Sequence, residues 1–192
     1  MRRAKLMVIG GSAGSLQVIM EIVSSIRPDF PVPVLIVLHR NSIFESSLEE
    51  LFASRSQATI KEVEEKELVM PGVIYIAPAD YHVLIEEDHT FSLDYSERVN
   101  FSRPSIDVTF RCASDVYGPD LVCLLLSGGN ADGVEGLAYV KDRGGVVVVQ
   151  DPVTAQVPYM PQHAITQVAV DFVVQAEDLP AFLKGLAFLP PV

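Results

Sequence analysis

The chain has 192 residues, of which 49% are hydrophobic and 20% charged, and its formal net charge is −11. This composition excludes a disordered chain, and the length predicts a single domain over residues 1–192. The negative charge argues against a nucleic-acid partner, which would require a basic surface. Because no apolar run approaches roughly 18 residues, we expect no membrane insertion and a cytoplasmic protein.

The two cysteines, Cys112 and Cys123, are too few for a disulfide framework. They also lack the C-x-x-C spacing of a metal or redox site. We therefore expect both to be small core residues in a reducing compartment, and we expect neither a metal nor a cofactor.

The first predicted strand, residues 6–9, runs directly into the turn 10–14, with sequence GGSAG. Apolar residues then recur at spacings of three and four over 16–26, which predicts a helix. A serine on a G-x-S-x-G turn between a strand and a helix has the geometry of an exposed nucleophile, here Ser12. The turn alone leaves a second interpretation open, in which it binds phosphate or only packs tightly.

The next predicted strand, residues 32–38, ends in His39. A capping-box pattern predicts a helix over 47–54. Short β patterns follow, separated by Pro, Gly and Asp turn signals, and the last two form a predicted hairpin. These β patterns cover residues 59–63, 73–77, 83–86 and 90–93.

Helical periodicity returns over 106–117 and is closed by Gly118. Alternating strands and helices follow to the end of the chain. The strands are residues 121–126, 146–149 and 172–174, and the helices end near 142, begin near 161 and cover 178–188. This order predicts an α/β fold, a doubly wound, mostly parallel sheet flanked by helices, with a β-hairpin excursion in the middle of the chain.

Ligands of open parallel sheets bind at the carboxyl ends of the strands, so polar residues just past those ends are candidates for a site. They comprise a serine, a histidine, three carboxylates and one amide, which include the nucleophile, general base and orienting acid of a hydrolase. The residues are Ser12, His39, Asp80, Asp132, Gln150 and Asp151.

Among the four histidines, His39 is the preferred base because it directly ends a buried strand, although a capping or packing role stays open. His82 begins a hairpin strand, His89 lies in a turn and His163 lies in a helix. Position alone leaves two candidates for the orienting acid. Asp132 follows a hydrophobic strand but could be only a helix cap, and Asp151 is the alternative.

Several segments resemble one family, the catalytic domain of the bacterial chemotaxis receptor methylesterases (CheB), which hydrolyse glutamate methyl esters on chemoreceptors. The resemblance runs over nearly the whole chain, and its specificity comes from seven short motifs in order at fitting spacing. The motifs lie at residues 8–14, at the strand ending in His39, and at 74–78 with His82, 103–107, 127–133, 144–151 and 160–161.

The resemblance implies that Ser12 is the nucleophile, His39 the base and Asp132 the orienting acid. It implies that backbone N–H groups near Ala13 and Gly129 form the oxyanion hole. The implied reaction is hydrolysis of glutamate methyl esters on chemoreceptors with release of methanol, without a cofactor. Glutamine deamidation is a side activity of the family.

Three positions depart from the family pattern. Gly129 stands where a methionine is usual, Arg40-Asn41 where Met-Pro is usual, and Gly14-Ser15 where two glycines are usual. These changes bear on substrate fit more than on the chemistry. They leave two alternatives open: a non-catalytic scaffold in a sensory complex, and a serine esterase acting on another substrate.

Family members often carry an N-terminal receiver domain that restrains the esterase. Because Ser12 is the twelfth residue, we expect no such domain before it on this chain. Either a separate receiver protein provides control, or the chain is a piece of a longer protein. Arg40 and Arg103 are candidates to meet acidic receptor helices, while the alternative for Arg103 is hydrogen bonding to backbone carbonyls.

Overall fold

The computed structural model describes residues 4–39 and 48–187, and its centre is a seven-stranded sheet in the order β3-β4-β2-β1-β7-β8-β9. Every pairing in this sheet is parallel. The strands are β1 (Leu6–Gly11), β2 (Val34–Leu38), β3 (Thr59–Glu62), β4 (Val73–Ile76), β7 (Leu121–Leu125), β8 (Val146–Gln150) and β9 (Phe172–Val174). The predicted doubly wound parallel α/β fold is confirmed.

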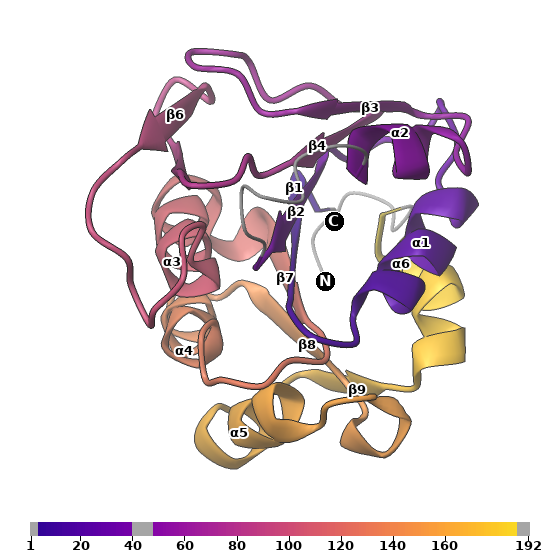
Figure 1. Cartoon of the computed structure of the whole chain (residues 1–192), viewed down its shortest axis with the longest axis vertical. Coiled ribbons are helices and arrows are strands. Elements are labelled where there is room, and N and C mark those ends of the chain that lie inside the picture. The colour runs from indigo at the N-terminus through magenta and orange to yellow at the C-terminus, as the bar shows by residue number, and fades with distance from the viewer. Residues whose placement is uncertain (1–3, 40–47, 188–192) are drawn as a thin grey trace.

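Helices cover both faces of the sheet (Figure 1). One face carries α1 (Leu16–Ser25), α2 (Leu48–Ala53) and α6 (Leu179–Ala187), and the other carries α3 (Ile106–Tyr117), α4 (Val134–Asp142) and α5 (Tyr159–Gln167). No helix within the described ranges is long and apolar enough to cross a membrane.

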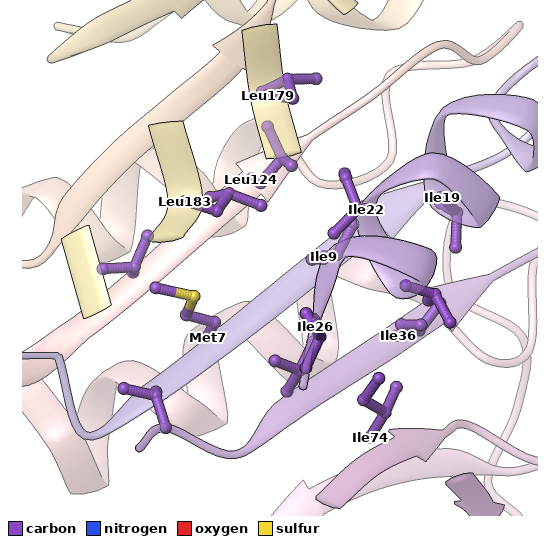
Figure 2. Packing of buried hydrophobic residues seen from close by; sticks show 14 of the residues in the cluster. Met7, Ile9, Ile19, Ile22, Ile26, Ile36, Ile74, Leu124, Leu179 and Leu183 are labelled. Carbon is purple, nitrogen blue, oxygen red and sulfur yellow. The ribbon is translucent and has the colours of Figure 1, made fainter. Parts of the chain in front are cut away.

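Alternating residues of each strand supply the two halves of the core. In β1, Met7 and Ile9 face the α1 and α6 side, as Figure 2 shows, while Leu6 and Val8 face the side of α3. All four side chains are at most 1% exposed. A strand buried on both faces needs apolar residues at every position, which is why these segments are continuous hydrophobic runs.

The predicted hairpin is β5 (His82–Ile85) with β6 (Phe91–Asp94), a separate antiparallel pair. Two predicted boundaries move for reasons of proline chemistry. The strand expected over 32–38 begins at Val34, after Pro33, which has no N–H to give to a neighbouring strand. The helix expected from 161 begins at Tyr159, because proline is tolerated in the first helical turn, where Pro161 lies. Ser47 and residue 188, parts of two predicted helices, lie outside the described residues.

The chain order reverses at β1, whose neighbours in the sheet are β2 and β7. This reversal is the topological switch point, where the loops leaving adjacent strands diverge and open a crevice. The three loops that meet there follow β1, β2 and β7. They carry the serine, the histidine and one of the carboxylates predicted from the strand ends.

Candidate active site

The turn after β1 holds Ser12 in one position by backbone hydrogen bonds. The Ser12 N–H donates to the carbonyl of Ser127 at 2.9 Å, and the Ser15 hydroxyl donates to the carbonyl of Ser12 at 2.7 Å. Glycine is required at Gly10, because a Cβ there would lie 2.4 Å from the Ile106 side chain. The turn therefore packs directly against the start of α3, and Ser12 stays half-buried.

His39 lies between Ser12 and Asp132. Its Nδ1 is 3.1 Å from the Ser12 Oγ, and its Nε2 is 2.7 Å from the Asp132 Oδ2. Because an ionised carboxylate can only accept, Nε2 carries the proton and Nδ1 is free to accept the serine proton. The two ring nitrogens thus exchange the positions they hold in the serine protease template, where Nε2 faces the serine.

The other predicted candidates lie elsewhere. Asp151 caps a 3-10 turn through the Val153 N–H, and Asp80 faces Arg98 at 4.0 Å. His89 packs against Tyr117, and His163 stacks on Tyr159. His82 is buried between two backbone groups, and Gln150 accepts from the Ser127 N–H. Of the alternatives that the sequence left open, the structure brings only His39 and Asp132 to Ser12.

The Asp132 carboxylate is fully buried and saturated with donors. Besides His39, it accepts from the N–H groups of Ile106 and Asp107 at the start of α3, at 2.7 and 3.2 Å, and from the Ser105 hydroxyl at 2.8 Å. Burial raises the pKa of Asp132, but the hydrogen bonds, led by that of His39, outweigh it and lower the pKa to about 2. The start of a helix favours this anion, so Asp132 stays ionised at neutral pH.

A second buried carboxylate, Asp107, lies beside Asp132. It accepts from the Gly136 N–H at 2.6 Å, and the Asn100 side-chain amide donates to both carboxylates. Burial, together with the neighbouring charge of Asp132, raises the pKa of Asp107 to about 7. Sequence reasoning missed Asp107 and Asn100 as parts of the site, because neither residue follows a strand end.

The raised pKa of Asp107 predicts a pH dependence of stability that Asp107→Asn removes. The folded chain holds this proton more tightly than the unfolded chain. The carboxyl therefore favours folding below its ordinary pKa of 3.8, and this contribution is lost as the pH rises through about 7. One proton is equivalent to about 1.4 kcal/mol per pH unit. Urea titrations should show the variant gaining roughly 2 kcal/mol of unfolding free energy over the wild type between pH 5 and pH 7. Parallel curves would contradict the assignment.

Two exposed residues, Ala13 in the loop after β1 and Gly129 in the loop after β7, have unpaired backbone N–H groups among the described residues. The neighbouring Gly128 is fixed, since its N–H donates to the Val157 carbonyl at 3.1 Å and its own carbonyl accepts from Met160 at 3.0 Å. The Ser127 hydroxyl ties this loop to the Ala13 carbonyl at 2.7 Å. The loops after β1 and β7 thus each carry a backbone N–H without an acceptor among the described residues.

The structure describes only one of the two arginines that were candidates for receptor contacts. Arg40 lies outside the described residues. The Arg103 guanidinium donates to the carbonyls of Tyr95 and Ser96, at 3.1 and 2.6 Å, and lies over the Tyr95 ring. The structure thus gives Arg103 the backbone-binding role that was its alternative.

The cysteines and metal ligands of the described residues form no second site. Cys123 is buried in β7, as expected, and Cys112 is half-buried against the backbone of Ile85. No group of three metal-ligating side chains occurs in residues 4–39 or 48–187.

Comparison with known proteins identifies the fold and the family. A family model described as CheB methylesterase matches residues 7–183. The crystal structure of the Thermotoga maritima CheB methylesterase catalytic domain superposes with a TM-score of 0.91 at 34% identity, covering 95% of this chain and 98% of that one.

Two sequence relatives differ in length. A Leptospira interrogans protein, provisionally named a protein-glutamate methylesterase/protein-glutamine glutaminase, is 44% identical over 90% of this chain and 89% of its own length. The Thermotoga maritima protein-glutamate methylesterase/protein-glutamine glutaminase is 35% identical over 95% of this chain but only 54% of its own. The chain therefore spans about half of that longer relative. From the family model, the relatives and the superposed structure together, the chain belongs to the CheB methylesterase family.

Proposed function

We propose that this chain is a serine esterase that hydrolyses glutamate methyl esters on methylated chemoreceptors. The observation that supports it best is the contact chain from the Ser12 hydroxyl through the His39 imidazole to the Asp132 carboxylate. Three residues from three separate loops meet at the topological switch point, with a half-buried serine on a sharp turn. We further propose that residues 1–192 act as one domain and that the protein works in the cytoplasm.

The proposed reaction begins when His39 Nδ1 accepts the Ser12 proton and Oγ attacks the ester carbonyl carbon. Asp132 holds the His39 tautomer and stabilises the imidazolium that forms. The tetrahedral intermediate collapses with cleavage of the bond to methoxide, which takes the proton from His39 and leaves as methanol. Water, deprotonated by His39, then attacks the acyl-enzyme and releases glutamate and free Ser12.

In this proposal the N–H groups of Ala13 and Gly129 stabilise the oxyanion, as free donors that need no rearrangement. A backbone donor does not depend on the side chain, so glycine at position 129 is compatible with the chemistry. A Cβ at Gly129 would meet nothing closer than 3.9 Å. The position therefore has room for a Cβ.

Two neighbouring glycines provide a matched test of this oxyanion loop. Gly129→Ala should keep kcat for a methyl ester within about threefold of wild type, because the new Cβ enters open space and the N–H remains. Gly128→Ala should lower kcat roughly 10–100-fold, because its Cβ would lie 2.4 Å from buried Met160 and displace the loop. Equal effects of the two substitutions would argue against an oxyanion donor at this loop.

The same acyl-enzyme serves a second substrate. A glutamine side chain differs only in its leaving group, since ammonia departs in place of methanol after protonation by His39. We therefore propose protein-glutamine glutaminase activity at this site, supported by the paired activities in the names of the relatives. Control by a separate receiver protein is part of the same proposal.

The direct test is methanol release from membranes that contain a methylated chemoreceptor. The proposal expects wild-type protein to release methanol stoichiometrically with the loss of receptor methyl esters. A small p-nitrophenyl ester provides a second arm. Hydrolysis of the small ester without receptor demethylation would favour an esterase with another substrate, and inactivity in both arms would favour a non-catalytic scaffold.

A further inference from the structure

The loop of residues 95–103 contains a tight turn that lies beside the triad. Val99 and Ser102 exchange two backbone hydrogen bonds, at 3.2 and 2.9 Å, and enclose Asn100 and Phe101. Both enclosed residues have positive φ, 51° and 63°, which is the pattern of a type I′ turn. Asparagine tolerates this conformation, whereas phenylalanine adopts it rarely.

The base of the loop is fixed by two buried or half-buried side chains. Arg103 donates to the carbonyls of Tyr95 and Ser96, and the buried ring of His82 bonds to the Glu97 carbonyl at 3.0 Å. The other ring nitrogen of His82 accepts from the N–H of Ser105, next to the start of α3. The turn is therefore held in a constant position relative to the helix that carries the Asp132 donors.

From this turn the Asn100 amide reaches inward to two carboxylates. Its Nδ2 donates to Asp107 Oδ2 at 2.7 Å and to Asp132 Oδ1 at 3.1 Å. Asp107 and Asp132 are 5% and 0% exposed, although the residue that bridges them lies on the surface. Two adjacent carboxylates repel each other when both are ionised, and a neutral amide that donates to both offsets this repulsion.

The contact to Asp132 falls on the oxygen that His39 does not use. His39 bonds to Oδ2, whereas Asn100 bonds to Oδ1. Asn100 shares Oδ1 with the Ser105 hydroxyl and the Asp107 N–H, and together these donors limit rotation of the carboxylate and keep Oδ2 directed at His39 Nε2. Resting on the proposed function, we propose that Asn100 is a positioning residue of the triad, whose amide bridges Asp107 and Asp132 and thereby sets the orientation of the acid.

A merely structural role would require only a residue that tolerates positive φ. Glycine meets this requirement at least as well as asparagine, so Asn100→Gly keeps the turn and removes only the amide. The matched control is Phe101→Gly, which places glycine at the other central position and leaves the amide in place. Comparing the two variants separates the effect of losing the amide from the effect of placing glycine in the turn.

We expect N100G to lower kcat for a methyl ester roughly 10–100-fold with KM within about twofold, as is usual when a supporting hydrogen bond behind a functional group is lost. F101G should retain kcat within about twofold. Both variants should still unfold cooperatively, N100G at a lower temperature than F101G because two buried carboxylates lose their shared donor. Equal kcat values for N100G and F101G would overturn the proposal.

An exchange of amide and carboxylate gives a rescue test. N100D places a third carboxylate against the existing pair and should be slower than N100G. The double variant N100D/D107N returns the cluster to one amide and two carboxylates, with the amide now at position 107, where its oxygen can still accept from the Gly136 N–H. We expect it to exceed N100D at least tenfold in kcat. Failure of the exchange to raise kcat would contradict the bridging role.

The rate of Ser12 labelling by a fluorophosphonate distinguishes failure of this inference from failure of the proposed function. Absence of labelling in the wild-type chain would contradict the proposed esterase function itself. A labelled wild type with N100G labelled at the same rate would leave the esterase in place and overturn only the role of Asn100. We expect a labelled wild type and N100G slower by the same factor as its kcat.

Discussion

Replacing Ser12 with alanine is expected to lower the rate of methanol release from a methylated receptor by roughly four to six orders of magnitude. The substitution removes the only atom that can form the acyl-enzyme in the proposed reaction, while the oxyanion donors and substrate contacts remain. The fold should be unaffected, because within residues 4–39 and 48–187 the Ser12 side chain contacts only the His39 ring by hydrogen bonding, and the turn is held through the Ser12 backbone.

The control for this substitution is Ser24→Ala. Ser24 is an exposed serine on α1 whose hydroxyl donates to the Met20 carbonyl within the same helix. We expect this variant to match the wild type in methanol release and in thermal unfolding. An S12A chain that keeps more than a few per cent of the wild-type rate would refute the assignment of the nucleophile.

Replacing Asp132 with asparagine is expected to lower kcat about 10⁴-fold, by changing the tautomer of His39. The amide nitrogen must occupy one of the two carboxylate oxygen positions. The Oδ1 position faces three donors, from Asn100, Ser105 and the Asp107 N–H. Among the described residues, the Oδ2 position faces the Ile106 N–H and His39 alone, so the new N–H₂ goes there.

With an N–H₂ group facing it, His39 Nε2 becomes an acceptor, and the ring proton moves to Nδ1, against Ser12. The base then cannot take the serine proton. The control is Asp151→Asn at the next strand end, whose carboxylate caps a 3-10 turn away from the triad. We expect the control to keep kcat within about twofold, measured as methanol release. Similar losses in both variants would contradict the choice of Asp132 as the acid.

Local sequence patterns predicted most of the sheet and the position of the nucleophile turn. A buried strand that runs into GGSAG and then into helical spacing leaves few alternatives, because only glycine permits α3 to approach as closely as Ile106 does at Gly10. The topology then follows from alternation of strands and helices, since the ends of parallel strands gather at one edge.

The choice between Asp132 and Asp151 could not be made from strand ends, because both follow apolar strands of the same sheet. The difference lies in what each carboxylate meets: the start of α3 in one case, and its own turn in the other. The N–H groups of α3 come from residues 26 and 25 positions before Asp132, which no local pattern relates to it.

The contacts of Asn100 with Asp107 and Asp132 could not be predicted from the sequence either, because no local pattern relates these residues. Asn100 lies in an irregular loop, 32 residues from Asp132, and its sequence context favours only a turn. Asp107 falls within a motif shared with the family, but a motif does not indicate that its carboxyl is buried against a second one. Long-range contacts between polar side chains follow from tertiary packing, which periodicity does not encode.

Mass spectrometric mapping of a fluorophosphonate adduct tests the central claim most directly. The probe reacts with a serine only where a neighbouring base activates the hydroxyl. We predict one adduct per chain, on Ser12, formed at a rate that falls sharply in D132N. A chain that remains unlabelled at saturating probe, or one labelled at another serine, would contradict the account.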